Sequence, residues 1–130
     1  MQQATTQSHA IAPARVLRGP GAWADALPAI TTLCQRPLLL GRSAATTALR
    51  QGLEGQLRGA GLEPVAACLQ HDCCESDLAR LAHACNTAAC DAVLAVGGGK
   101  VLDAGKLLAH RLGLACITVP SSAATCAGWT

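Results

Sequence analysis

The chain has 130 residues, of which 51% are hydrophobic and 14% are charged, so it can bury a core and is not disordered throughout. Ten Lys and Arg residues nearly balance eight Asp and Glu residues. With no Tyr or Phe to stack on bases, this balance argues against a nucleic-acid partner. No stretch comes near the ~18 apolar residues of a membrane span, and the first 15 residues lack the apolar core of a signal peptide. We therefore expect a cytoplasmic protein with no membrane segment.

The expected organisation is one domain, residues 14–130, after a loose tail of residues 1–13. Within that domain, short apolar runs bounded by Gly, Pro and polar residues are typical of buried strands. These runs predict a short extended piece at residues 15–17 and strands at residues 37–41, 63–69, 92–96 and 115–119.

Between the strands, apolar residues recur every three or four positions, as they do in helices that pack on one side. The predicted helices are residues 23–34, a helix capped by Ser43 and ended by Gly59, one capped by Ser76 or Asp77, and residues 100–112. Pro28 lies inside the first helix and predicts a late start or a kink there. In the second helix, Leu49, Leu53 and Leu57 are among the residues expected on the apolar side.

Alternation of apolar strands with helices predicts a doubly wound α/β fold whose mostly parallel sheet is covered on both faces. In such folds, ligands bind beyond the carboxyl ends of the strands. The turn at Gly97–Gly99 and the segment 120–130 lie at two of these ends. They are therefore the first places to look for a functional site.

Gly97, Gly98, Gly99 and Lys100 follow the strand at residues 92–96 and precede a helix. Glycines let a phosphate approach the peptide N–H groups, and the positive end of the next helix favours an anion. The pattern is not G-x-G-x-x-G, because position 102 is Leu, and it does not have the P-loop spacing either. It therefore indicates a phosphate-binding turn without ATP hydrolysis, and a plain tight turn is the alternative.

The string from Val96 to Lys106 resembles the GGGK-x-x-D-x-x-K signature of the glycerol dehydrogenase branch of the iron-containing alcohol dehydrogenase superfamily. The segment Val119–Thr125 resembles the second cofactor loop of that family, a VPT-x-A-S-T-D pattern. The segments Gly19–Ala22 and Pro37–Gly41 are similar to its opening. The resemblance covers about residues 14–130.

This resemblance implies a two-domain oxidoreductase that moves a hydride between an alcohol or polyol and NAD or NADP. In the family, a C-terminal helical domain holds zinc or iron through an Asp and two His. The four His of this chain do not match those ligands. We therefore expect the cofactor-binding portion of a dehydrogenase, inactive by itself and able to form a homo-oligomer. The alternative is a stand-alone or degenerate nucleotide-binding module.

The resemblance also assigns individual residues. Gly97–Gly99 would lie against the cofactor pyrophosphate, with Lys100 and Asp103 nearby. Ser121 matches a family threonine that contacts the cofactor, and Thr130 matches a serine near the nicotinamide.

Three positions depart from the family pattern. Arg42 stands about where the family has an Asp for the adenosine ribose, which suits the 2′-phosphate of NADP; a surface arginine is the alternative. Ala124 lacks a family serine hydroxyl. Cys126 occupies the position of the substrate-binding Asp, and because a thiol is a poor substitute for a carboxylate, this argues against glycerol as the substrate.

The chain has eight cysteines, which in a cytosolic protein we expect as free thiols. The group that most resembles a zinc set is His71, Cys73, Cys74, His83, Cys85 and Cys90. It contains no C-x-x-C pair, and residues 83 and 85 would point to different sides of a helix. We therefore assign no metal ligand in this chain, and a thiol-rich metal or redox module is the weaker alternative.

Overall fold

The computed structural model of the chain describes residues 22–42, 44–71 and 74–121. The elements in these residues are α1 (Ala22–Leu33), β1 (Pro37–Gly41), the short 3-10 helix η2 (Ala44–Thr46), α2 (Thr47–Gly59), β2 (Val65–Cys68), α3 (Glu75–Ala88), β3 (Ala92–Gly97), α4 (Gly99–Leu112) and β4 (Ala115–Pro120). The tail, the piece at 15–17, Ser43, Ala124, Cys126 and Thr130 lie outside them. Within the described part, none of the helices is both long and apolar enough to span a bilayer.

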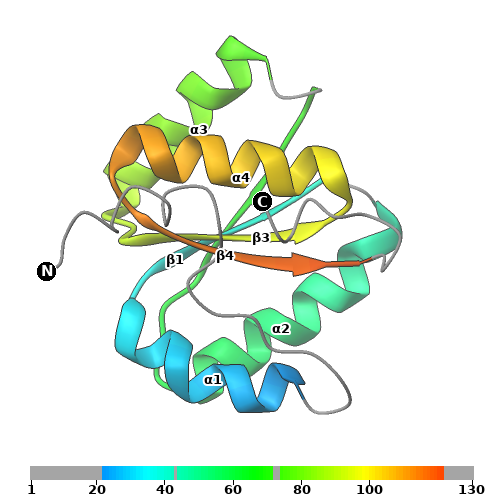
Figure 1. The fold of residues 1–130 in the computed structure, drawn as a ribbon, viewed down its shortest axis with the longest axis vertical. Helices are drawn as coiled ribbons and strands as arrows, with labels where there is room; N and C mark the ends of the chain where they lie inside the picture. Colours follow the sequence, from blue (N-terminus) through cyan, green and yellow to red (C-terminus); the bar gives the residue numbers. More distant parts are fainter. Residues whose placement is uncertain (1–21, 43, 72–73, 122–130) are drawn as a thin grey trace, which may run out of the picture.

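The four strands form one parallel sheet in the order β2-β1-β3-β4 (Figure 1). The central strand β1 pairs with both neighbours: Leu38 is in register with Val65 of β2 and with Val93 of β3. The chain thus moves from β1 to one side of the sheet and later returns to the other side. This reversal lies between β1 and β3, and it confirms the predicted doubly wound α/β fold.

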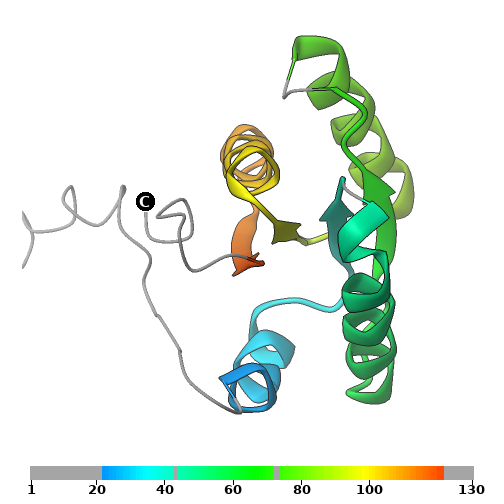
Figure 2. The same ribbon diagram turned by 90° about the vertical axis from the view of Figure 1, so that its right-hand side faces the viewer.

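Helices cover both faces of the sheet, with α1 and α2 on one side and α3 and α4 on the other (Figures 1 and 2). Leu38 and Leu40 of β1 pack with the α3 and α4 side chains, whereas Leu39 packs with those of α1 and α2. Every residue of β1 and β3 is buried. This two-sided burial explains why these strands are apolar throughout rather than alternating.

Three local predictions are wrong. Helix α1 does not start late: it begins at Ala22 and continues through Pro28. This is tolerated because the N–H that proline lacks would have bonded to the carbonyl of Ala24, an exposed residue. Leu49 is 43% exposed because it lies in the first turn of α2, at the carboxyl edge of the sheet, while Leu53 and Leu57 are buried as expected.

The third correction concerns the start of α3. Cys74 is the N-cap residue, in place of the predicted Ser76 or Asp77. The Asp77 carboxylate instead accepts hydrogen bonds from the backbone N–H groups of Gln70 and His71, which precede the helix. The side chain therefore ties the loop after β2 to α3 and does not cap the helix.

Candidate functional site

The turn between β3 and α4 is fixed by its backbone. Gly97 has φ +148°, and a Cβ there would lie 3.3 Å from Cγ2 of Val101, so the position requires glycine. The N–H of Ser121 donates to the carbonyl of Gly97 at 2.9 Å, and the N–H of Leu102 donates to the carbonyl of Gly98 at 3.1 Å. The turn is thereby held to the end of β4 and to the first turn of α4. The first N–H groups of α4 have no acceptor within the helix and point toward this turn.

Helix α4 lies unusually close to β3. A Cβ on Gly105 would lie 2.6 Å from the Cβ of Ala95, so only glycine allows this approach. Leu102 and Leu108 of α4 are fully buried and belong to the same core cluster as Ala95. This contact fixes the direction in which the N-terminus of α4 points. The sequence analysis missed Gly105, although a small residue in the strand and a glycine in the following helix were a usable signal.

A cavity of about 390 Å³ opens at this turn, above the carboxyl ends of β1, β3 and β4. It is lined by Arg42, Thr46, Gly97, Gly98, Gly99, Lys100, Val101 and Ser121. The structure thus brings Arg42 and Ser121, which the sequence separates by many residues, to the glycine turn. The cavity lies at the point where the strand order reverses, which is where doubly wound folds bind their ligands.

The charges around this cavity suit an anion. Among the residues that the structure describes, the ionisable groups of the lining are Arg42 and Lys100; both are basic, and no carboxylate is among them. The N-terminus of α4 adds its partial positive charge at Gly98 and Gly99. Phosphate groups are the biological anions that such turns commonly hold.

Thr46 is a lining residue that the sequence analysis did not select. Arg50, one helical turn later, donates hydrogen bonds to the hydroxyls of Thr46 and Thr47. A second guanidinium therefore stands beside the lining, against Gly41 at the end of β1. Hydroxyl residues soon after a buried strand were the available signal, but without the strand order nothing linked them to the glycine turn.

Asp103 lies outside the lining of this cavity. Its side chain is 68% exposed, and one carboxylate oxygen is 4.0 Å from Nζ of Lys106, so the two residues lie on one side of α4. Cys126 and Thr130 lie outside the described residues, so the structure assigns them no place.

Within residues 22–42, 44–71 and 74–121, the cavity lining includes no histidine, cysteine or carboxylate, so this part of it offers no usual ligand for a catalytic metal. The six-residue zinc set considered from the sequence is not assembled in the described part of the chain. Cys85 is buried, and burial raises the pKa of its thiol to about 12. His83 instead lies 3.5 Å from the Thr87 hydroxyl, on an exposed part of α3. Another grouping does occur: His71, Cys74 and Asp77 place one potential ligand atom each within 4.8 Å of one another.

Comparison with known proteins gives consistent matches. The sequence profile of the iron-containing alcohol dehydrogenases matches residues 13–130. An uncharacterized oxidoreductase of Synechocystis sp. is 41% identical over 123 residues, covering 95% of this chain and 31% of that protein. A glycerol dehydrogenase of Escherichia coli is 30% identical over 118 residues, covering 85% of this chain and 32% of that protein.

A solved structure agrees with these sequence matches. Maleylacetate reductase from Agrobacterium tumefaciens superposes with a TM-score of 0.73 and 27% identity, over 85% of this chain and 31% of that one. The chain therefore spans about a third of the length of each of these relatives.

Proposed function

We propose, from the premise that this chain belongs to the iron-containing alcohol dehydrogenase family, that its glycine turn binds NAD or NADP. The chain would be the cofactor-binding portion of a metal-dependent alcohol or polyol dehydrogenase. One observation carries the proposal: the cavity at Gly97–Lys100 lies where the strand order reverses, and its described lining residues include two cations and no carboxylate.

In this proposal the pyrophosphate lies across the first N–H groups of α4. Gly98 and Gly99 leave room for close approach, and Lys100 adds a positive charge. Ser121 offers a hydroxyl from the end of β4. Asp103 and Thr130 are assigned to the cofactor by the family resemblance, with Thr130 near the nicotinamide.

We further propose a preference for NADP. In doubly wound sheets the adenosine ribose lies at the end of the strand next to the glycine turn, and here that strand is β1, followed by Arg42. A family member that uses NAD has a carboxylate at this position to accept the ribose hydroxyls. A guanidinium instead pairs with a 2′-phosphate, and Arg50 behind Thr46 adds to the positive field.

The reaction itself needs groups beyond those described. A zinc or iron ion, when bound in this family, polarises the alcohol oxygen and eases hydride transfer to the nicotinamide. None of the lining residues in the described part of the chain is suited to hold that ion. We propose that this chain by itself binds cofactor but does not oxidise alcohols, and that Cys126, at the position of the substrate carboxylate, makes glycerol a poor substrate.

Fluorescence titration of the 130-residue chain with NADPH and NADH tests the cofactor proposal. We expect NADPH to bind more tightly, and Arg42→Asp to reverse the preference by about ten- to a hundredfold, because a charged hydrogen bond to phosphate contributes roughly 1.5–3 kcal/mol. Arg58→Asp makes the same charge change in the last turn of α2 and is the matched control. If neither nucleotide binds at millimolar concentration, the cofactor proposal is wrong; if both variants shift the ratio equally, Arg42 acts only through net charge.

A further inference from the structure

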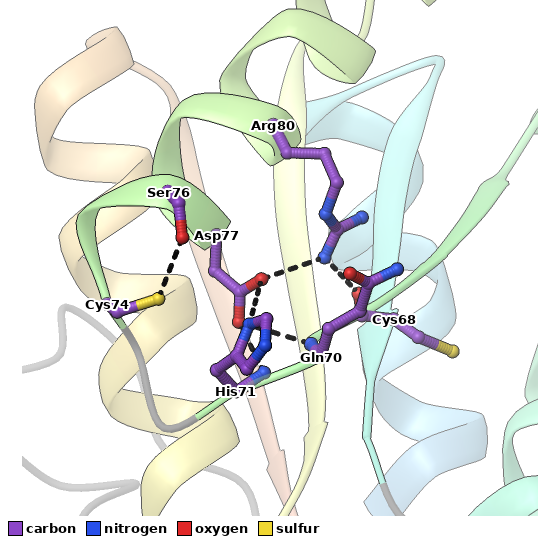
Figure 3. A network of polar contacts seen from close by, with 7 residues as sticks. All are labelled: Cys68, Gln70, His71, Cys74, Ser76, Asp77 and Arg80. Carbon is purple, nitrogen blue, oxygen red and sulfur yellow. Dashed lines mark hydrogen bonds and ion pairs between the residues drawn. The ribbon is translucent and has the colours of Figure 1, made fainter.

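The loop between β2 and α3 gathers three side chains of different chemistry. His71 ends the described part of the loop, Cys74 caps α3, and Asp77 lies in the first turn of that helix (Figure 3). Nδ1 of His71 is 3.3 Å from Oδ1 of Asp77, and one potential ligand atom from each of the three residues lies within 4.8 Å of the others. We propose that His71, Cys74 and Asp77 form a binding site for a divalent cation of the zinc class.

Asp77 is the fixed part of this site. It is 1% exposed, and its Oδ2 accepts hydrogen bonds from the backbone N–H groups of Gln70, at 3.1 Å, and of His71. Burial alone would raise the pKa of the Asp77 carboxyl, but the hydrogen bonds from His71 and Arg80 outweigh it and hold the pKa below its usual range. The carboxylate is therefore charged at neutral pH, and hydrogen bonds from two backbone N–H groups hold it in place.

His71 and Cys74 are the accessible part. The His71 side chain is 64% exposed and Cys74 is also exposed, so an ion can reach both from solvent. The Ser76 hydroxyl, 3.1 Å from the Cys74 sulfur, and the N–H of Asp77 lower the pKa of the thiol. A thiolate is the form of cysteine that binds metal.

The spacing of these groups is close to that of a tetrahedral centre. Bonds of about 2.0–2.3 Å place the ligand atoms of a zinc ion roughly 3.3–3.8 Å apart. His71 and Asp77 already have that separation, so closing the site requires only a modest movement of the exposed Cys74 side chain. One nitrogen, one sulfur and one oxygen ligand suit zinc or cobalt, whereas magnesium and calcium prefer oxygen alone.

Arg80 is the positive charge that this site must tolerate. One of its Nη atoms donates to the Cys68 carbonyl at 2.7 Å and lies 3.3 Å from Oδ1 of Asp77. Figure 3 shows Arg80 and Cys74 on opposite sides of the Asp77 carboxylate, so the guanidinium can keep its place when an ion binds. With Arg80 positive and with Asp77 and the Cys74 thiolate negative, the groups around the ion carry one net negative charge.

The sequence criterion for zinc could not find this site. That criterion required paired cysteines, whereas this group contains one cysteine in the described residues and draws its carboxylate from the following helix. None of the three residues lines the cofactor cavity. The site is therefore independent of the proposed dehydrogenase function, and the two can be tested separately.

Cobalt titration of the chelator-treated chain tests the proposal, because a Co²⁺–thiolate bond gives a charge-transfer band in the near ultraviolet. We expect one equivalent to bind, zinc to displace it, Cys74→Ser to abolish the band, and His71→Gln to weaken binding at least about tenfold. Cys68→Ser removes another exposed thiol, at the end of β2, and should change nothing, and Cys73→Ser should also keep the band.

Circular dichroism and NADPH titration of each variant establish that the fold and the cofactor cavity are intact. Wild-type chain that shows no band, or a band that survives in Cys74→Ser, overturns the site. A band lost only in Cys73→Ser overturns the assignment of Cys74.

Discussion

Two turns at the same edge of the sheet have opposite character. The turn after β3 presents backbone N–H groups, glycines and the cations Arg42 and Lys100. The turn after β2 presents side chains, with a buried carboxylate at its centre and a thiol and an imidazole above it. In one parallel sheet, therefore, one strand end attracts an anion and another is suited to a cation.

The comparison shows that two different parts of the chain determine ligand chemistry. After β3 the chemistry comes from the backbone path, so glycine at the right φ matters more than any side chain. After β2 it comes from side-chain donors, and the backbone serves to hold Asp77 through the N–H groups of Gln70 and His71. The two turns should consequently respond to different substitutions.

The largest expected effect is on thiol reactivity, because the turn after β2 exposes the Cys74 side chain. Cys74 is exposed with a lowered pKa, whereas burial raises the pKa of Cys85 to about 12 and that of Cys34 to about 11. Because the thiolate is the nucleophile, we expect Cys74 to be alkylated in the folded protein at least about a hundredfold faster than Cys85. Mass spectrometry of timed iodoacetamide labelling measures both rates, and equal rates would mean that the turn is not preorganised as described.

Substitutions within the glycine turn should separate its fold from its function. Gly97→Ala places a side chain at φ +148° and should cost about 1–3 kcal/mol of unfolding free energy in urea denaturation. Gly98 has φ −86° and a Cβ there would meet nothing within 4 Å, so Gly98→Ala should stay within about 0.5 kcal/mol. Its methyl group should nevertheless weaken NADPH binding. Equal losses of stability in both variants would show that the backbone path is not what makes this turn special.

Acid titration should reveal the carboxylate that holds the β2 turn. The folded pKa of Asp77 is depressed, so as pH falls the unfolded chain takes up protons first and stability decreases. The contribution is present above the ordinary carboxyl pKa of about 3.9 and is lost as pH falls through the lower folded value. Asp77→Asn should therefore be less stable than wild type at pH 7, with a gap that narrows in acid. Urea denaturation at several pH values checks this, and a constant gap would exclude Asp77 as the source.

Most of the fold could be predicted from the sequence because burial on both sides leaves a contiguous pattern. The run Ala92–Val96 is apolar throughout, and every residue of β3 is buried. The failures occurred where the environment of one residue decides the outcome. Pro28 is tolerated because its side of α1 meets water, and Leu49 is exposed because it lies in the first turn of α2, at the edge of the sheet. Neither exposure can be predicted from the neighbouring residues in the sequence.

The candidate sites divide in the same way. Gly97–Lys100 could be found because four adjacent residues determine the turn. Thr46 could not, because its role depends on which strand lies beside which. Gly105 left a usable signal in the sequence, but its role became clear only from how closely α4 approaches β3. The group around Asp77 was missed because the sequence pattern assigned Asp77 a role as a helix cap. Only the geometry of the loop shows that its carboxylate faces His71 and Cys74.

Asp103 is the remaining assignment on the β3 side, and it should have the smallest effect. The family resemblance assigns it to the cofactor, but its side chain is 68% exposed, pairs loosely with Lys106 and lies outside the cavity lining. An ion pair at 4.0 Å whose carboxylate is largely in water contributes little, so Asp103→Asn should change unfolding free energy by less than about 0.5 kcal/mol. NADPH affinity should change less than about threefold, which corresponds to well under 1 kcal/mol. A larger loss of affinity with unchanged stability would place the cofactor over the outer side of α4. The anion site would then be built partly from side chains, which would bring the two turns closer in character than the structure indicates.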